Sequence, residues 1–311
     1  MTMLAYAFRK FAYFFCSLWI IATLTFILMK SVPGDPFAEE QVLRNDMQEA
    51  LSQHYGLNDP WPVQYKNYMR SLLQGDLGYS LKYPGQSVNR IIQEGFPVSA
   101  LLGLEAFFWA ISIGIALGTL AALQAGKWQE TAVLCVTTIG VSVPSFILAA
   151  LLQYTLALKL GLFPLARWGT FAQTLLPSLA LAALPLAFVA RLTRASLIEV
   201  LQTDYIKIAR AKGLSFFALI KSHALRNALL PVLSYLGQLM ANILVGSFVI
   251  EKIFSIPGLG QWFVNSVVNR DYSLIMGLTL FYSVILMTSL FCVDMAYGLL
   301  DPRIRLLKRE D

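Results

Sequence analysis

Two carboxylic acids, Glu105 and Asp294, are embedded in long apolar stretches of the sequence. An ionised acid at the centre of a bilayer costs about 2.5 to 3.5 kcal/mol, so each side chain is expected to face a helix bundle, a water-filled cavity or an interface. Acids in such places can transfer protons, or they can hydrogen-bond one helix to another. Both acids stand toward the ends of their apolar stretches, which favours a role in helix packing and leaves proton transfer as the alternative.

A dense block of charge occupies residues 204–231, between two long apolar runs. Asp204 is a candidate N-cap, Gly213 stands where a left-handed residue would end a helix, and Ser215 is a candidate cap for a second short helix. The segment is therefore predicted to be a water-facing loop that is folded into helices. A folded loop of this kind is usually a surface that another protein binds.

The sequence shows no catalytic or metal-binding pattern. A GxxxxGK[ST] nucleotide loop is absent, and the two histidines, His54 and His223, fall on opposite sides of the membrane in the expected topology. Cys16, Cys135 and Cys292 all lie inside apolar stretches and are expected to be buried, so no disulfide framework is indicated. We therefore expect no enzyme activity, no cofactor and no metal in this chain, and ATP-driven work would need a separate protein.

The composition indicates a membrane protein. Apolar residues make up 57% of the 311 residues, charged residues make up 14%, and the mean hydropathy is +0.62. A soluble protein carries about 25% charged residues. Because a bilayer requires roughly 20 apolar residues per helix, the sequence predicts an all-α polytopic protein with about six spans. The spans are expected at residues 11–30, 97–122, 131–158, 176–193, 229–250 and 274–299.

Small residues and prolines inside the expected spans predict how these helices pack. Gly114 and Gly118 form a GxxxG step, which lets two helices approach closely. Pro144 and Pro185 would kink or loosen the helices that contain them. The fourth span carries small side chains on several of its sides: Ala180, Ala182, Ala183 and Ala187.

The distribution of positive charge predicts the orientation. Arg9 and Lys10 precede the first span, and the segments expected on the inner side hold 14 of the 24 Lys and Arg residues. By the positive-inside rule, both termini and the 204–231 loop are expected in the cytoplasm. The net charge of +6 and the pI near 9.2 then reflect membrane orientation, and no nucleic-acid partner is expected.

The segment from 31 to 96 is the one sizeable region expected outside the membrane on the other side. Its first helix would carry an apolar stripe of Leu43, Met47, Ala50 and Leu51 and would end at Gly56. A second helix would open at Pro60 or Pro62, carry Val63, Met69, Leu72 and Leu73 near one face, and end before Gly75-Asp76-Leu77-Gly78. Such a two-helix cap could cover the mouth of a pore, bind a soluble partner or brace the bundle, and the sequence leaves these alternatives open.

Several short motifs occur in a fixed order along nearly the whole chain. They are Pro33-Gly34-Asp35-Pro36, Tyr55-Gly56-Leu57, Gly75-Asp76-Leu77-Gly78, Ala209-Arg210-Ala211-Lys212-Gly213, His223-Ala224-Leu225-Arg226-Asn227-Ala228, Pro257-Gly258-Leu259-Gly260, Arg270-Asp271-Tyr272 and Asp301-Pro302-Arg303. In this order they resemble the permeases of ABC importers, in the form carried by the oligopeptide and dipeptide family. Several motifs in register are much more specific than any one of them alone.

The resemblance implies a type I ABC importer permease fold in the cell (inner) membrane, forming half of a translocation pathway for peptides. The implied partners are a homologous second permease subunit, two ABC ATPase subunits on the cytoplasmic side, an extracytoplasmic substrate-binding protein and the lipid bilayer. The same branch also serves nickel and glutathione importers, and the sequence does not separate these cargos. The expected organisation is a tail and first span at 1–30, an extracytoplasmic region at 31–96, a permease core at 97–299 with a coupling loop at 194–228, and a cytoplasmic tail at 300–311.

The wider importer superfamily carries Glu-Ala-Ala, three residues, Gly, nine residues and then Ile-x-Leu-Pro. With Gly213 aligned, only Ala209, Gly213 and Leu225 match this pattern. Lys207 stands where the acid is expected, so no role of that acid is carried over to this chain. The departures are those of the peptide-type branch.

The resemblance makes the charged loop the part that couples the permease to its ATPases. The residues expected to act there are Asp204, Tyr205, Lys207, Ile208, Ala209, Arg210, Ala211, Lys212 and Gly213. A short amphipathic helix could sit in a cleft on an ATPase through apolar contacts and complementary charge. When the ATPases close on nucleotide, the docked helix would be carried along and the spans would switch from inward-facing to outward-facing.

Two other functions remain open at the level of sequence. A proton- or ion-coupled secondary transporter would use Glu105 and Asp294, would transport without ATPases, and would be expected to carry inverted repeats with paired broken helices, which are not seen. A membrane scaffold or receptor would move nothing. Copurification with two ATPases would favour the importer over both.

Overall fold

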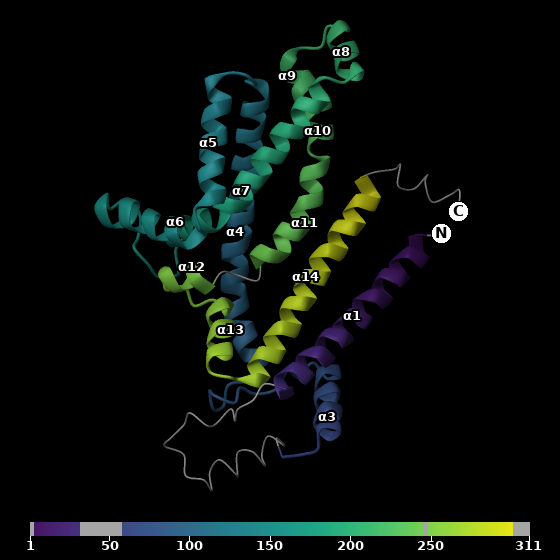
Figure 1. Ribbon diagram of the computed structural model, residues 1–311, viewed down its shortest axis with the longest axis vertical. Coiled ribbons are helices and arrows are strands. Elements are labelled where there is room, and N and C mark those ends of the chain that lie inside the picture. Colours follow the sequence, from purple (N-terminus) through teal and green to yellow (C-terminus); the bar gives the residue numbers. More distant parts are fainter. Residues whose placement is uncertain (1–2, 32–57, 245–247, 301–311) are drawn as a thin grey trace. The chain divides into compact units, whose positions relative to one another are not determined.

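The computed structural model describes residues 3–31, 58–244 and 248–300, and Figure 1 shows the arrangement of the helices. Within those ranges the regular structure is helical, apart from an isolated antiparallel bridge between Tyr79 and Ser87. The helices are α1 (Met3–Ser31), α3 (Trp61–Leu73), α4 (Val88–Leu123), α5 (Trp128–Ser142), α6 (Ser145–Leu152), the π-helix η1 (Gln153–Lys159), α7 (Phe171–Leu201), α8 (Asp204–Ala211), α9 (Phe216–Ala218), the π-helix η2 (Leu219–Ala224), α10 (Leu225–Ala228), α11 (Leu230–Leu244), α12 (Phe248–Ile253), α13 (Leu259–Val268) and α14 (Tyr272–Leu300).

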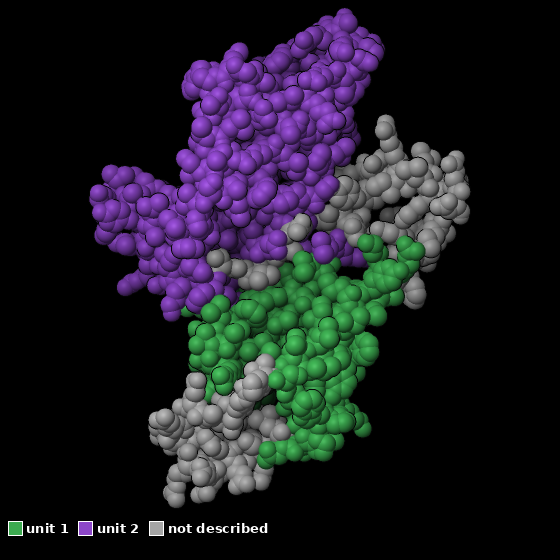
Figure 2. All heavy atoms as spheres, in the orientation of Figure 1, with its two compact units in different colours: residues 1–96, 261–287 green, residues 97–260, 288–311 purple. Residues whose placement is uncertain are grey.

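The chain divides into two compact units, which Figure 2 colours separately. Unit 1 comprises residues 1–96 and 261–287, and unit 2 comprises residues 97–260 and 288–311. The first expected helix of the 31–96 region, with Leu43 and Gly56, lies outside the described residues.

Among the described residues, four helical stretches are long and apolar enough to cross a membrane: Arg9–Ser31, Val88–Leu123, Phe171–Leu201 and Tyr272–Cys292. The bent pair Trp128–Ser142 and Ser145–Lys159 brings the number to five if it counts as one span. The expected all-α membrane fold is therefore confirmed. The span expected at 229–250 is not among the five; it includes residues 245–247, which lie outside the described part of the chain, and α11, with 15 residues, is the helix described before them.

The third expected span is not one straight helix, since α5 and α6 meet at an angle of 108°. Pro144 precedes α6, and Val143 before it is extended, with φ −86° and ψ 120°. A proline disfavours helical geometry in the residue before it, so α5 ends here. The kink predicted at Pro144 is confirmed. Pro185, in contrast, lies inside the continuous helix α7, which extends beyond residues 176–193 at both ends.

In unit 1, α3 packs on α1 through aromatic side chains. The ring of Phe26 lies 5.4 Å from that of Tyr65 and 5.8 Å from that of Tyr68, and the hydroxyls of Thr23 and Tyr65 are 2.8 Å apart. Burial, together with nearby Tyr65, raises the pKa of the Tyr68 hydroxyl to about 12. The predicted start of this helix is confirmed, with Pro60 as the N-cap.

The apolar face predicted for α3 is partly wrong. Val63 is 43% exposed and Leu73 is 90% exposed, while Met69 and Leu72 are half-buried. The amphipathic tyrosines form the packing face, because their rings reach α1. The predicted break after the helix is confirmed, since Gly75 and Gly78 have φ values of +75° and +87°.

Unit 1 is also stabilised by a fully buried acid, Asp271, which directly precedes α14. Its carboxylate accepts hydrogen bonds from the backbone N–H groups of Leu81 at 3.1 Å and Leu274 at 3.2 Å, and from the hydroxyl of Ser80. Asp271 therefore joins the segment around residue 80 to the first turn of α14. An acid at this end of a helix is also favoured by the helix dipole.

In unit 2, α4 and α7 approach closely at the predicted GxxxG step. A Cβ atom at Gly118 would lie 2.4 Å from the carbonyl oxygen of Ala190, and one at Gly114 would lie 2.8 Å from the side chain of Val189. Only glycine fits such a crossing without displacing the neighbouring helix. The prediction of close helix approach through these glycines is confirmed.

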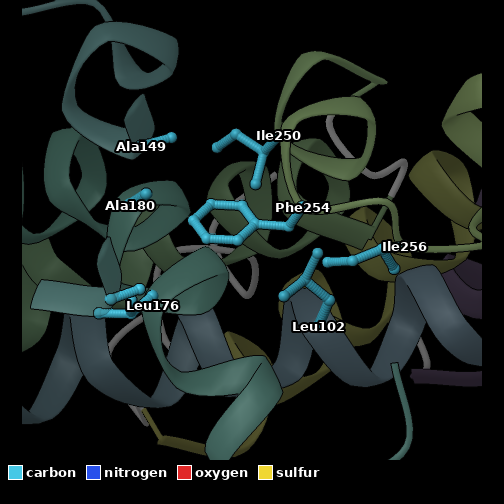
Figure 3. Packing of buried hydrophobic residues seen from close by; sticks show 8 residues of the cluster. Leu102, Ala149, Leu176, Ala180, Ile250, Phe254 and Ile256 are labelled. Carbon is cyan, nitrogen blue, oxygen red and sulfur yellow. The ribbon is translucent and has the colours of Figure 1, made fainter. Parts of the chain in front are cut away.

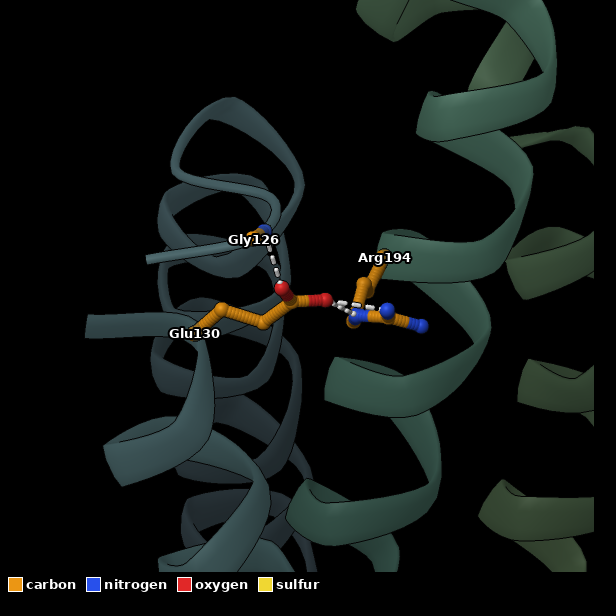
Figure 4. Close-up of polar contacts among 3 residues, drawn as sticks. All are labelled: Gly126, Glu130 and Arg194. Carbon is orange, nitrogen blue, oxygen red and sulfur yellow. Dashed lines mark hydrogen bonds and ion pairs between the residues drawn. The ribbon is translucent and has the colours of Figure 1, made fainter. Parts of the chain in front are cut away.

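Helix α5 packs on α7 through polar contacts near one end of each helix (Figure 4). Glu130 accepts a hydrogen bond from the Nε of Arg194 at 2.7 Å and another from the backbone N–H of Gly126 at 2.6 Å. One turn earlier on α7, the guanidinium of Arg191 donates to the hydroxyl of Thr138 at 2.8 Å. Both arginines are thus tied to α5.

The largest buried side chain of unit 2 is that of Phe254, which follows α12. Figure 3 shows its ring directed toward Leu176 and Ala180 of α7, and Leu102 belongs to the same cluster.

The three cysteines, in contrast, are exposed on the surface of the chain, so their predicted burial is wrong. A span offers an apolar residue the lipid as an environment, so apolar character does not require burial inside the chain.

Candidate functional site

The charged loop predicted between two apolar runs is a compact helical insertion between α7 and α11, and we call residues 204–228 the α8–α10 segment. It contains α8, α9, η2 and α10. In Figure 1 it lies at the end of α7 and α11 that is away from α12. The predicted helical loop is therefore present, and its local geometry decides which side chains it presents.

The ends of the short helices agree with the predictions at two of three positions. Gly213 has φ +81° directly after Lys212, the C-cap of α8. Ser215 is the N-cap of α9, and its hydroxyl oxygen accepts the N–H of Ala218 at 3.4 Å. Asp204 is not the N-cap, because Thr203 takes that position and α8 begins at Asp204 itself.

One face of α8 is buried against the rest of unit 2. Ile206 is 2% exposed and Ala209 is 8% exposed, and both belong to a cluster with Leu197 of α7 and with Leu219 and Ala224 of η2. Ala209 is among the residues expected at the ATPase contact, but its side chain packs against other residues of this chain. Ile206, which the sequence reasoning did not single out, anchors α8 together with it.

The other face of α8 is open. Tyr205 is 40% exposed and Ile208 is 56% exposed, so both remain available for an apolar contact. Lys207 donates to the carboxylate of Asp204 at 2.8 Å, and both side chains are largely exposed. The remaining expected residues, Arg210, Ala211, Lys212 and Gly213, are also exposed.

A hydrogen bond joins α8 to α10 across the segment. The Nδ2 of Asn227 donates to the hydroxyl of Tyr205 at 2.8 Å. Together with the buried face of α8, this bond fixes the two helices relative to each other. A force applied to α8 would therefore be transmitted to α10 and, through the chain, to α11.

A groove of about 1050 Å³ lies beside α8. Tyr205 and Ile208 contribute to it from α8, and so does Lys212, the C-cap of α8. His223 of η2 and Arg226 of α10 contribute to it as well. The lining contains no Asp or Glu. The segment thus combines an anchored helix with a hollow whose charged side chains are basic.

The two intramembrane acids do not form a site that the structure can describe. Glu105 is half-buried in α4, and its Oε2 is inaccessible to solvent and without a hydrogen-bond partner among the described residues. Asp294 lies in α14, and its side chain is outside the described part of the chain. Their roles stay predictions.

Within the described ranges, no group of three or more His, Cys, Asp or Glu residues is arranged to hold a metal ion.

The sequence reasoning missed a buried acid, Glu251 in α12, which is 0% exposed. The hydroxyl of Ser99 donates to its carboxylate at 2.8 Å, and the same Ser99 oxygen accepts the N–H of Leu259 at 2.8 Å. A Cβ atom at Gly258 would lie 2.5 Å from the Glu251 carboxylate, so the glycine after Pro257 provides space as well as a turn. The signal that could have found Glu251 is its position one residue beyond an expected span.

Comparison with known proteins agrees with this architecture. The family model described as "Binding-protein-dependent transport system inner membrane component" matches residues 114–306, and the model of the N-terminal part of the same kind of membrane component matches residues 3–102. The chain is similar to the dipeptide transport system permease protein DppB of Bacillus subtilis, with 50% identity over 99% of this chain and 100% of that protein. It is also 43% identical to the oligopeptide transport system permease protein OppB of Escherichia coli, over 93% of this chain and 95% of that protein.

Solved structures share the fold at lower sequence identity. An inward-facing structure of the MetNI methionine ABC transporter matches with a TM-score of 0.56 and 17% identity, over 68% of this chain and 96% of that chain. The crystal structure of an amino acid ABC transporter matches with a TM-score of 0.52, also at 17% identity, over 67% of this chain and 92% of that chain. These likenesses confirm the type I importer permease fold. The chain is a multi-pass inner-membrane protein, a permease subunit of an ABC importer, and it belongs to the family of binding-protein-dependent transport system inner membrane components.

Proposed function

We propose that this permease subunit forms half of a pathway for peptides and is driven by separate ATPase subunits that dock on α8. The cargo is proposed from the dipeptide and oligopeptide permeases to which the chain is similar over nearly its whole length. The other half would be a homologous permease chain, and an extracytoplasmic binding protein would deliver the cargo. In this proposal both termini and the α8–α10 segment lie in the cytoplasm.

The observation that carries the proposal is the two-sided character of α8. Ile206 is buried within the chain, while Ile208, two residues later, is 56% exposed on a helix outside the four candidate spans. An exposed apolar side chain of this kind is a good anchor for a protein partner. The buried face and the Tyr205–Asn227 hydrogen bond would then carry motion of the partner into the spans.

Reconstitution tests the proposal directly. The permease is purified together with its proposed partner subunits, placed in liposomes with the binding protein, and supplied with a panel of dipeptides, longer peptides, glutathione and nickel. We expect copurification of ATPase subunits and a rise in ATP turnover with peptides. Uptake driven by an ion gradient without the ATPases would contradict the proposal, and stimulation by glutathione or nickel alone would contradict the cargo.

Gly213 offers a more specific test of coupling. Its φ of +81° is unfavourable for a β-branched residue, although no atom lies within 4 Å of the position of a Cβ. Gly213→Val is therefore expected to shift α8 and to uncouple ATP hydrolysis from uptake while membrane insertion is kept. Gly126→Val is the matched control, since Gly126 has φ +80° and equally open surroundings but lies outside the α8–α10 segment. Equal coupling in both variants would refute the role of the turn.

A further inference from the structure

The groove beside α8 has a composition that suits a particular kind of occupant. Its apolar lining includes Ile208 and Leu214, which are 56% and 37% exposed. Lys212 and Arg226 contribute cationic side chains, His223 contributes an imidazole, and no acid contributes to the lining. An occupant that buries these apolar surfaces and supplies a carboxylate would complement the groove in both respects.

The cations of the groove are available for such a carboxylate. Within the described ranges, the side chains of Lys212 and Arg226 form no ion pair and no hydrogen bond. Lys207, which does not line the groove, is instead paired with Asp204 on the same helix. A guanidinium binds a carboxylate through two parallel hydrogen bonds, so Arg226 is the best recognition element in the groove.

The position of the groove favours a protein over a lipid as its occupant. Arg191 and Arg194 follow the apolar part of α7 and are expected to lie at the surface of the bilayer. Val200, which lines the groove, stands six residues beyond Arg194 on the same helix, or roughly 9 Å further along its axis at 1.5 Å per residue. The end of the groove at Val200 is therefore expected in water beyond the level of the lipid headgroups, while Leu230 and Leu233 of α11 line its other end.

The surroundings of the groove are also unusually apolar for a surface in water. Phe217 is 85% exposed and Phe216 is 52% exposed, both in α9, which directly follows Leu214 and Ser215. Exposed aromatic side chains close to a groove commonly mark a surface that a protein partner covers.

We propose that the groove receives an acidic side chain flanked by apolar residues on the surface of the ATPase subunit, with Arg226 as its main partner. This inference rests on the proposed function, in which an ATPase docks on α8. It adds that the contact is interlocking: α8 enters the ATPase, and an acid-bearing segment of the ATPase enters the space between α8 and α10. The acid, which the wider superfamily carries on the permease, would here be supplied by the ATPase.

Charge reversal in the permease tests the inference. Arg226→Glu is compared with Lys221→Glu, which makes the same change at an exposed site of η2 that does not line the groove. The affinity of the purified ATPase for the permease complex in nanodiscs is measured at low and at high salt. We expect Arg226→Glu to weaken binding by about tenfold or more at low salt, Arg226→Gln by less, and Lys221→Glu by no more than about twofold.

A reciprocal change identifies the acid. Asp and Glu residues on the ATPase surface are replaced by Lys one at a time, and at least one replacement is expected to restore binding to the Arg226→Glu permease. Equal losses for Arg226→Glu and Lys221→Glu, with no restoring replacement, would overturn the inference. If the unaltered permease bound no ATPase at all, the proposed function itself would fail, which is a distinguishable result.

A lipid occupant is tested with the same variants. Nanodiscs of phosphatidylglycerol and of phosphatidylcholine are compared, and the lipid retained by the purified permease is measured by native mass spectrometry. We expect the same retained lipid in Arg226→Glu and in the unaltered chain. Loss of retained phosphatidylglycerol with unchanged ATPase affinity would overturn the inference in favour of a lipid site.

Discussion

The α8–α10 segment and the site of Asp271 both contain charged side chains, but they use them in opposite ways. Asp271 is fully buried, and its carboxylate is surrounded by hydrogen-bond donors from Ser80, Leu81 and Leu274. In the α8–α10 segment, Lys212 and Arg226 are exposed, and their side chains have no partner in the described part of the chain. A buried charge whose hydrogen bonds are all made within the chain stabilises the fold. An exposed charge without a partner in the chain is available to bind another molecule.

This comparison predicts that the largest losses of stability come from Asp271. Asp271→Ala leaves the Ser80 hydroxyl and the backbone donors without their acceptor in a buried place. Each such group costs about 1 to 3 kcal/mol, so we expect a loss of about 3 kcal/mol or more. Thermal unfolding of the purified chain in detergent measures it.

Asp76→Ala is the control for Asp271, because Asp76 is exposed and, within the described ranges, its carboxylate accepts only the N–H of Gly78, at 2.9 Å. The expected loss is about 1 kcal/mol or less. A control variant as unstable as Asp271→Ala would show that acids in this region act through general charge rather than through buried hydrogen bonds.

The crossing of α4 and α7 predicts a further loss of stability. Gly118→Ala places a Cβ 2.4 Å from the Ala190 carbonyl oxygen, a backbone atom that cannot move alone, and should cost about 1 to 3 kcal/mol. Gly140→Ala, at the α5–α7 contact, places its Cβ 3.2 Å from the Ala183 oxygen and should be tolerated better. Unfolding temperatures of the two variants rank them, and the reverse order would contradict the close approach of α4 and α7.

Two isoleucines of α8 separate stability from recognition within one helix. Ile206→Ala removes a buried side chain and should destabilise the chain by about 2 kcal/mol or more. Ile208→Ala removes an exposed side chain, so it should change stability by no more than about 0.5 kcal/mol and lower the affinity for the ATPase. Unfolding and ATPase binding are measured on both. A loss of stability without any loss of binding in Ile208→Ala would contradict the docking role of this face.

The smallest effect is expected at the bond between α8 and α10. Tyr205→Phe removes the hydroxyl that accepts from Asn227, and a hydrogen bond of this kind contributes about 0.5 to 1.5 kcal/mol. We expect a loss of stability of no more than about 1.5 kcal/mol and a lower ratio of peptide transported to ATP hydrolysed. Asn227→Ala should give the same ratio, and additive effects in the double variant would argue that the two side chains act independently.

The residues that could be predicted from the sequence are those whose conformation depends on near neighbours. Gly213 ended a helix and Ser215 began one as predicted, and the helix bends at Pro144 as predicted. A left-handed turn, a hydroxyl cap and the restriction that proline places on the residue before it all act within a few residues. The GxxxG step at Gly114 and Gly118 also has a local signature, although its partner helix does not.

The residues that could not be predicted depend on long-range packing. Ala209 and Ile208 are neighbours in the sequence, and only the position of η2 decides that Ala209 is buried and Ile208 is not. Asp271 meets Ser80 across 191 residues and Glu251 meets Ser99 across 152, distances at which a single sequence carries no pattern. Asp204 was displaced as N-cap by Thr203, a difference of one residue that lies within the usual uncertainty of helix ends.

The central claim is that the open face of α8 contacts the ATPase. A photo-reactive amino acid placed at position 208 tests it most directly, and a light-activated group avoids labelling the three exposed cysteines of the chain. Position 73, at the end of α3, is the control, because Leu73 is 90% exposed and the proposed topology places it on the opposite side of the membrane. The claim predicts a crosslink from position 208 to the ATPase and none from position 73; no ATPase crosslink at 208, or one at 73, would contradict it.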